Sequence, residues 1–159
     1  MTHLEHPWSL AFLPNGDILV TERPGRLRII RNGVLDPLPI AGVPDVHHHL
    51  DGGLLDLAVH PQFTTNRLVY FTYARAGDQG ATVALARGRF DGTTLHDVHD
   101  VFVADAWSTT DVQYGSRIAF GRDGTLFMSI GERNQRARPD ADRSCGHDHP
   151  DSRRWQRSR

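Results

Sequence analysis

The segment RIAFGRDGTLFMSIGE, residues 117–132, is the stretch that decides the fold class of this chain. Apolar residues alternate with other residues on both sides of Asp123-Gly124, and an Asp-Gly pair between two such runs is typical of a β-hairpin. The same device occurs around Asn15-Gly16, Asn32-Gly33 and Asp91-Gly92. Because residues 1–136 contain no convincing 3.6-residue apolar period, the sequence predicts an all-β body.

Three of the hairpins share one template, in which an apolar-Ala-apolar strand and a turn precede an apolar strand that ends in Ser or Thr. They are LAFLPNGDILVT (10–21), LAVHPQFTTNRLVYFT (57–72) and IAFGRDGTLFMS (118–129). Their spacing of about 50–60 residues is close to the ~40–50 residues of a four-stranded propeller blade. A β-sandwich would not repeat its own hairpin at blade spacing. We therefore predict a β-propeller, with about three blades in residues 1–137.

Composition excludes several classes of function. The chain of 159 residues has a formal net charge of -1 and a sequence pI of about 6.8, which does not suggest a partner such as nucleic acid. No apolar run approaches the ~18 residues of a membrane span. The single cysteine, Cys145, excludes a disulfide framework. The first residues lead straight into strand-like sequence, so we expect no signal peptide in this chain.

Residues 138–159 differ from the rest in composition. They include six arginines and no Leu, Ile, Val or Phe. A segment of this composition cannot bury enough apolar surface to pack, and the sequence predicts a disordered tail.

Three segments carry a family resemblance over residues 6–136: HPWSLAFLPNGDILVTERPGRLRII, then GGLLDLAVHPQF with NRLVYFTYA, then YGSRIAFGRDGTLFMSIGER. In this order and spacing they resemble the start of a soluble, PQQ-dependent aldose sugar dehydrogenase of the glucose/sorbosone dehydrogenase family. The resemblance implies a six-bladed β-propeller that binds pyrroloquinoline quinone (PQQ) and calcium and oxidises the C1 hydroxyl of an aldose to the lactone. It implies a periplasmic or secreted protein, and it places the cofactor and calcium ligands downstream of residue 159.

The resemblance also suggests an origin for the tail. Family members continue with a strand of the form His-x-Gly-Lys-Ile-Ile-Arg-Leu and an Asp-Gly turn. Back-translation of residues 143–158 with a shift of one base permits DHAGTIIRIHDDGSV, which fits that pattern. We interpret residues 138–159 as the product of a frameshift near Arg138. A partial ring leaves strand edges unpaired, so we expect poor solubility or self-association through those edges.

The catalytic position implied by the resemblance is occupied by Gln113, where the family has the histidine that takes the hydroxyl proton. A glutamine amide cannot accept a proton near neutral pH, and loss of a general base typically costs ~10²–10⁴-fold in rate. The alternative for Gln113 is an ordinary loop residue at a blade rim. Glu132 matches an acidic position that would orient the imidazole, and its alternative is a charge at the end of a strand.

Asp51 and Arg117 are the candidate substrate-binding residues. Asp51 stands where the family often has a glutamine that touches the sugar, and a carboxylate can accept hydrogen bonds from hydroxyls. Its alternative is an Asp-Gly turn. Arg117 follows Gly-Ser and could meet the cofactor or a carboxylate within the blades, in which case its role is structural.

The triplet His47–His49 raises a metal hypothesis, because neutral imidazoles are common zinc ligands. His47, His49 and Asp51 would lie on one side of an extended segment. Such a row in a loop usually faces solvent, so we assign no metal ligand.

Two functions are therefore compared. The first is the N-terminal portion of a PQQ-dependent sugar dehydrogenase acting on aldoses, inactive as this chain alone. The alternative is a non-catalytic propeller, a module that binds sugars or other partners and has lost its catalytic base.

Overall fold

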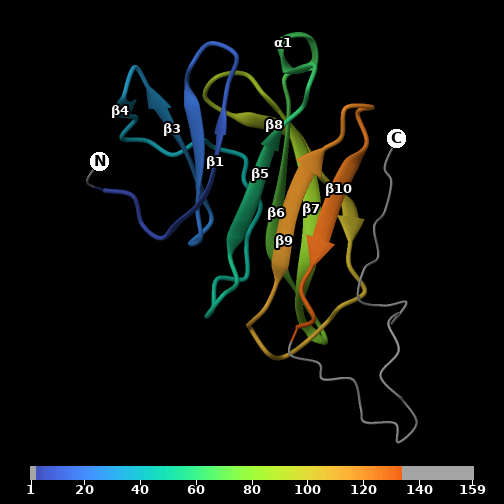
Figure 1. Ribbon diagram of the computed structural model, residues 1–159. Coiled ribbons are helices and arrows are strands. Elements are labelled where there is room, and N and C mark those ends of the chain that lie inside the picture. The colour runs from blue at the N-terminus through green and yellow to red at the C-terminus, as the bar shows by residue number, and fades with distance from the viewer. Residues whose placement is uncertain (1–2, 134–159) are drawn as a thin grey trace, which may run out of the picture.

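The computed structural model describes residues 3–133, shown in Figure 1. The strands are β1 Pro7–Phe12, β2 Ile18–Glu22, β3 Arg26–Arg31, β4 Val34–Leu35, β5 Leu54–Val59, β6 Leu68–Gly77, β7 Gly80–Phe90, β8 Leu95–Val103, β9 Gly115–Phe120 and β10 Leu126–Ile130, and helix α1 Phe63–Asn66 lies between β5 and β6. The predicted tail, residues 138–159, lies outside the described residues.

The strands form three antiparallel sheets in sequence order: β1-β2-β3-β4, β5-β6-β7-β8 and β9-β10. Contacts join β1 to β5 and β5 to β9, so the first strands of the three sheets lie next to one another (Figure 1). This is the arrangement of successive blades in a β-propeller. The predicted all-β propeller is therefore confirmed, with two four-stranded blades and, among the described residues, the first two strands of a third.

The hairpin turns follow two designs. Between β1 and β2 the Gly16 N–H donates to the Leu13 carbonyl (2.9 Å), and between β9 and β10 the Gly124 N–H donates to the Gly121 carbonyl (3.0 Å). Gly16 and Gly124 have φ angles of 89° and 82°, a conformation that glycine adopts without steric cost. Asn32-Gly33, with φ angles of 51° and 79°, instead forms the two-residue turn expected of Asn-Gly.

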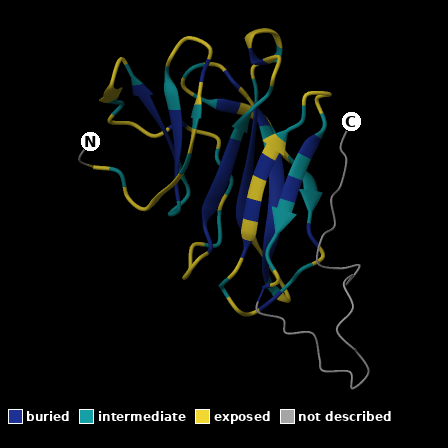
Figure 2. Cartoon of the chain, in the orientation of Figure 1, coloured by how far each residue is buried: buried dark blue, intermediate teal, exposed yellow. Residues whose placement is uncertain are grey.

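The core consists of two apolar clusters separated by β5. Leu54 and Leu55 are successive residues of β5 whose side chains point to opposite faces, so Leu54 joins one cluster and Leu55 the other. The first cluster lies between the first two sheets and includes Leu19, Leu27 and Phe71. The second packs the middle sheet on β9 and β10, and Figure 2 shows the continuous burial of the middle strands.

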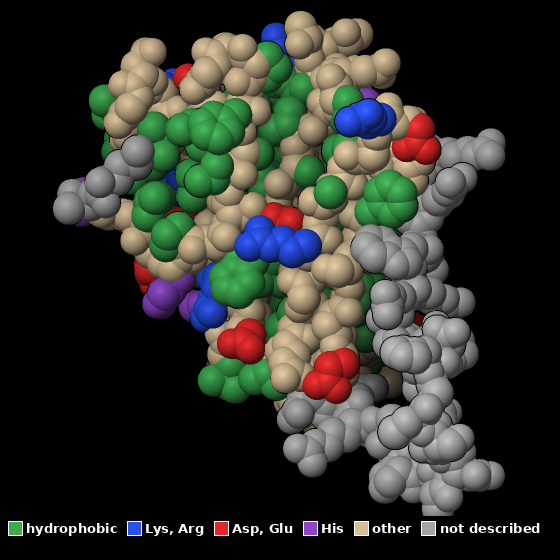
Figure 3. All heavy atoms as spheres, viewed as in Figure 1, with side chains coloured by type: hydrophobic (Ala, Val, Ile, Leu, Met, Phe, Trp, Pro, Cys, Tyr) green, Lys and Arg blue, Asp and Glu red, His purple; other side chains and the backbone are tan. Residues whose placement is uncertain are grey.

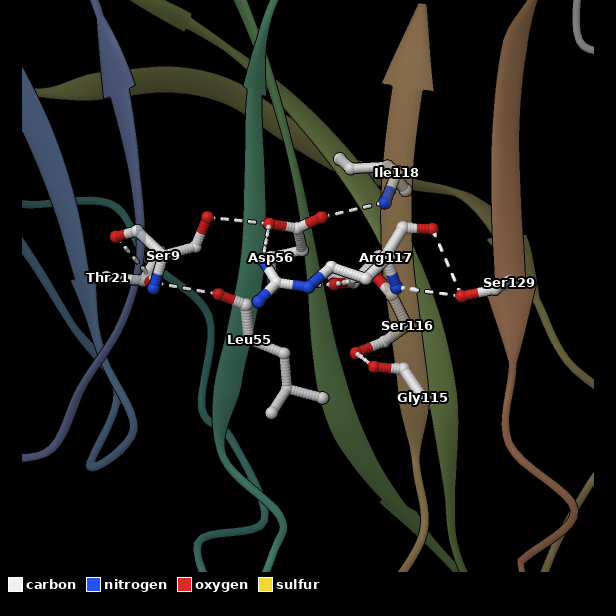
Figure 4. Close-up of polar contacts among 10 residues, drawn as sticks. Ser9, Thr21, Leu55, Asp56, Gly115, Ser116, Arg117, Ile118 and Ser129 are labelled. Atoms are coloured by element: carbon white, nitrogen blue, oxygen red, sulfur yellow. Dashed lines mark hydrogen bonds and ion pairs between the residues drawn. The ribbon is translucent and has the colours of Figure 1, made fainter.

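A buried carboxylate on β5 ties the three sheets together (Figure 4). Asp56 is 4% exposed. Its Oδ1 accepts a hydrogen bond from Ser9 Oγ on β1 (2.6 Å) and one from the guanidinium of Arg117 (3.1 Å). Its Oδ2 accepts from the Ile118 N–H on β9 (2.7 Å). Asp56 thus supplies, by hydrogen bonds, a link between first strands that do not belong to the same sheet.

The outer face of the first sheet carries exposed apolar side chains. Trp8, Leu10 and Phe12 alternate along β1 and are 38%, 56% and 67% exposed. Figure 3 shows hydrophobic side chains gathered on this part of the surface. Between residues 3 and 133, no helix has the length and apolar character needed to cross a membrane.

Candidate functional site

Two loops that lead into neighbouring first strands lie side by side. The 46–53 loop precedes β5 and the 110–114 loop precedes β9. The Asp51 N–H donates to the Asp111 carbonyl (2.9 Å), and the Gln113 N–H donates to Asp51 Oδ2 (3.2 Å). The two positions that the family resemblance singles out for base and sugar contact are therefore adjacent in space.

The carboxylate of Asp111 is the centre of this loop pair. Its Oδ1 lies 2.7 Å from His47 Nε2, and its Oδ2 lies 2.8 Å from His49 Nδ1. The Tyr114 hydroxyl also donates to Oδ1 (3.1 Å). Burial would raise the pKa of Asp111, but the hydrogen bonds from His49 and His47 outweigh it and lower that pKa. Asp111 is thus an ionised carboxylate at neutral pH, with an imidazole on each oxygen.

Arg133 fixes the 110–114 loop from the inside. It is 1% exposed, and its guanidinium lies 3.4 Å from the centre of the Tyr114 ring. Nη1 donates to the Val112 carbonyl (2.6 Å), while Nη2 donates to the carbonyls of Thr110 (2.9 Å) and Ala81 (3.2 Å). Hydrogen bonds from a charged group are among the stronger ones in proteins. The loop that carries Gln113 is therefore held rigidly against β7.

Close backbone contacts reinforce this rigidity. A Cβ atom on Gly131 would lie 1.9 Å from the Gln113 carbonyl oxygen, and one on Gly52 would lie 2.7 Å from the His47 carbonyl oxygen. Leu50 and Gln113 themselves have φ angles of 46° and 55°. Left-handed backbone at non-glycine residues is uncommon and tends to occur at functional sites.

The structure places the predicted site residues unequally. It brings Gln113 and Asp51 together, whereas Glu132 is exposed and Arg117 is held by Asp56. Glu132 follows Gly131, whose N–H donates to the Tyr114 carbonyl (2.9 Å), so its backbone runs beside the same loop. Arg117 meets a carboxylate within the blades, the structural alternative given above, and its side chain remains 66% exposed.

The histidines of the metal hypothesis converge on Asp111 and not on Asp51. Between residues 3 and 133 there is no group of three His, Cys, Asp or Glu side chains arranged to hold a metal ion. Asp111 and Arg133 were missed by the sequence reasoning. Asp111 lies two residues before Gln113 and Arg133 lies next to Glu132. These positions in the sequence were the only indication that either residue belongs to the site.

Cations at this end of the sheets are already bonded to protein groups. Arg23 donates to the Leu50 carbonyl, Arg117 to Asp56, and Arg133 to the backbone carbonyls given above. The carboxylates of a quinone such as PQQ require cationic partners. Each of these three arginines therefore already has a protein partner.

A cavity of about 530 Å³ lies at the opposite end of the first two sheets. It lies between the β1–β2 turn, α1 and the β7–β8 turn, and Arg31 and Asp17 are among its lining residues. Because Arg31 pairs with Asp36 (2.8 Å) and Asp17 (3.7 Å), its charge is neutralised within the protein. The loop pair around Asp111 is accordingly the candidate site.

Comparison of the sequence with known proteins gives consistent relatives. The family model "Glucose / Sorbosone dehydrogenase" matches residues 4–147. The chain is 49% identical over 137 residues to the uncharacterized protein slr1608 of Synechocystis, covering 81% of this chain and 33% of that protein. It is 41% identical over 137 residues to the aldose sugar dehydrogenase YliI of Escherichia coli, covering 84% of this chain and 37% of that enzyme.

Solved structures agree with these relatives. The soluble aldose sugar dehydrogenase from Escherichia coli in the apo form superposes with a TM-score of 0.80 at 40% identity, covering 84% of this chain and 40% of that structure. The PQQ-bound aldose sugar dehydrogenase from Streptomyces coelicolor gives a TM-score of 0.73 at 29% identity, again covering 84% and 40%. The chain thus spans between a third and two fifths of the length of these relatives.

Proposed function

Because this chain belongs to the glucose/sorbosone dehydrogenase family, we propose that it forms the first blades of an enzyme that oxidises the C1 hydroxyl of aldoses to lactones with PQQ as oxidant. The observation that carries the proposal is the pairing of the two loops. The resemblance assigns sugar contact to position 51 and proton removal to position 113. The backbone N–H of Gln113 donates a hydrogen bond to Asp51 Oδ2 (3.2 Å). The activity is proposed for the whole protein, since the chain spans 37% of its E. coli relative.

Support for PQQ comes from the relative solved in the PQQ-bound form. When bound, this quinone supplies a two-electron acceptor for the sugar. Calcium belongs to the proposal through the family resemblance. We propose that the residues that bind both groups lie in blades beyond this chain, as the family resemblance implies.

The described residues would contribute substrate contacts. The Asp51 carboxylate is exposed and retains acceptor capacity beyond its bond from the Gln113 N–H, which suits it to sugar hydroxyls. Arg117 is tied to Asp56, so its contribution would be limited to donors of the guanidinium that this pair leaves exposed.

The experiment is a dye-linked oxidation assay with a panel of aldoses, PQQ and calcium, carried out on the full-length gene product. We expect lactone formation that requires PQQ, and no activity from residues 1–159 alone. PQQ-independent turnover, or no turnover with any aldose, would contradict the proposal.

The alternative is a non-catalytic module that binds sugars, and one observation favours it. Position 113 carries an amide, which cannot act as a general base. Comparison of the parent with Gln113→His decides between the two functions. Activity only in the histidine variant would support the binding module, whereas activity in the parent would support the enzyme.

Two further expectations belong to this proposal. We infer that the protein acts in the periplasm or outside the cell, which fractionation of the source cells tests. We also propose that residues 138–159 arise from a frameshift. Sequencing the DNA from codon 130 past codon 159 in all frames tests this, and a sound frame with no further blades would remove the enzyme proposal.

A further inference from the structure

The proposed oxidation needs a group that takes the hydroxyl proton, and the Gln113 amide cannot do so. The side chains of the paired loops that can exchange a proton are those of His47, His48, His49, Asp51, Asp111 and Tyr114. The His48 ring lies beside His6, with 6.4 Å between ring centroids, and the partners of Asp111 are His47, His49 and Tyr114. The burial and the hydrogen-bond partners of these side chains show which of them could accept the proton.

Two of these groups are excluded by their surroundings. The Tyr114 ring is buried, and desolvation raises the pKa of its hydroxyl, which is bonded to Asp111. Asp111 accepts hydrogen bonds from His47, His49 and Tyr114 on its two oxygens. It can orient a base but has little acceptor capacity left for a substrate.

The two imidazoles are distinguished by exposure and by the nitrogen that meets Asp111. His47 uses Nε2, its side chain is 34% exposed, and its backbone N–H is bonded to the Ala74 carbonyl (2.8 Å). His49 uses Nδ1, and its side chain is 64% exposed. When Nδ1–H donates to the carboxylate, the neutral ring carries its lone pair on Nε2, the outer nitrogen.

We propose that His49, oriented by Asp111, is the proton acceptor of this site in place of residue 113. The inference rests on the proposed function and names its base. The O1–H bond of the aldose breaks and its proton passes to His49 Nε2. The cofactor, when held by residues of the full-length protein, would supply the two-electron acceptor for the C1 hydride, and C1–O would become the lactone carbonyl.

The matched test compares His49→Gln with His47→Gln. Each variant removes one imidazole from one oxygen of Asp111, so both perturb the loop pair similarly. In the full-length enzyme with PQQ and calcium, we expect His49→Gln to lower kcat by about 10²-fold or more with KM little changed. His47→Gln, which removes the other imidazole from Asp111, should lower kcat much less than His49→Gln does. Asp111→Asn should also lower kcat, because the amide no longer holds the His49 ring in the tautomer that exposes its Nε2 lone pair.

A second measurement does not depend on turnover. Diethyl pyrocarbonate modifies neutral imidazoles, and peptide mass spectrometry locates the modified residue. We expect saturating aldose to protect His49 and to leave His47 unprotected in the full-length protein. Equal modification of His49 with and without aldose would overturn the inference.

The outcomes separate the inference from the proposed function. An active parent whose rate survives His49→Gln but is lost in Asp51→Asn refutes the inference and leaves the enzyme proposal intact. A parent that becomes active only through Gln113→His refutes both, because the native site then lacks a base. With an inactive parent, protection of His49 by aldose would still support its contact with the sugar hydroxyl, while the enzyme proposal fails.

Discussion

Replacement of Asp56 by alanine should destabilise the chain more than replacement of any one of its partners. The carboxylate is 4% exposed and joins the first strands of all three sheets. In Asp56→Ala the Ile118 N–H is left buried without its acceptor, at a cost of about 1–3 kcal/mol. Loss of the Ser9 hydrogen bond to a charged group adds about 1.5–3 kcal/mol. The exposed Arg117 pair contributes at most about 1 kcal/mol.

We therefore expect Asp56→Ala to lower the free energy of unfolding by about 3–5 kcal/mol. Asp56→Asn should cost about 1–2 kcal/mol, because an amide oxygen still accepts from the Ile118 N–H and the amide nitrogen can donate to Ser9 Oγ. Arg117→Ala serves as the matched control, since it removes only the solvent-exposed partner.

The assay is urea unfolding of the full chain, followed by tryptophan fluorescence and far-ultraviolet circular dichroism. Midpoints and slopes give the free energy of each variant. If Asp56→Ala costs no more than Arg117→Ala, the three-sheet link is not a stabilising feature and the reasoning is refuted.

Gly131→Ala should displace the loop that carries Gln113, since the new Cβ would lie 1.9 Å from its carbonyl oxygen; loss of the chemical-shift pattern of this loop in NMR spectra, with the rest of the fold retained, would be the expected result. The lowered pKa of Asp111 means that its contribution to stability is present above its unfolded pKa and is lost as pH falls through the folded value. Acid titration of unfolding should therefore be less steep in Asp111→Asn than in the parent, and identical slopes would contradict this. The apolar side chains on β1 should cause self-association of the chain at micromolar concentration, and Leu10→Arg with Phe12→Arg should reduce it in light scattering; a monomeric parent would contradict that expectation.

The body of the fold could be predicted because its signals are local. Turn residues such as Asn32-Gly33 and Asp123-Gly124 stand between alternating runs, and their repetition gave the blade spacing. Sequential hairpins leave little choice of strand order, and the observed sheets follow that order. The single turn of α1 was not predicted, because four residues are too few to show a helical period.

The candidate site was predictable only in part, because its contacts are long-range. Asp111 meets His47 and His49 across 64 and 62 residues of sequence, and only the packing of successive blades brings them together. The burial of Arg133 was also not predictable from the sequence. Arginine is almost never fully buried unless paired, so nothing in the sequence indicated that Arg133 is buried while its neighbour Glu132 is exposed.

The glycines divide the two ends of the sheets into regions of different tolerance to change. In the hairpin turns, Gly16, Gly33, Gly92 and Gly124 have no other atoms within 4 Å of an added Cβ, whereas at the paired loops Gly52 and Gly131 are in close backbone contact. Insertions, dyes or surface linkers should therefore be accepted at the hairpin end, for instance beside Gly124. A protein attached to an electrode or a bead through that end would present the paired loops outward to the solution. The turn glycines themselves should persist there, because their positive φ angles disfavour other residues whatever the space around them.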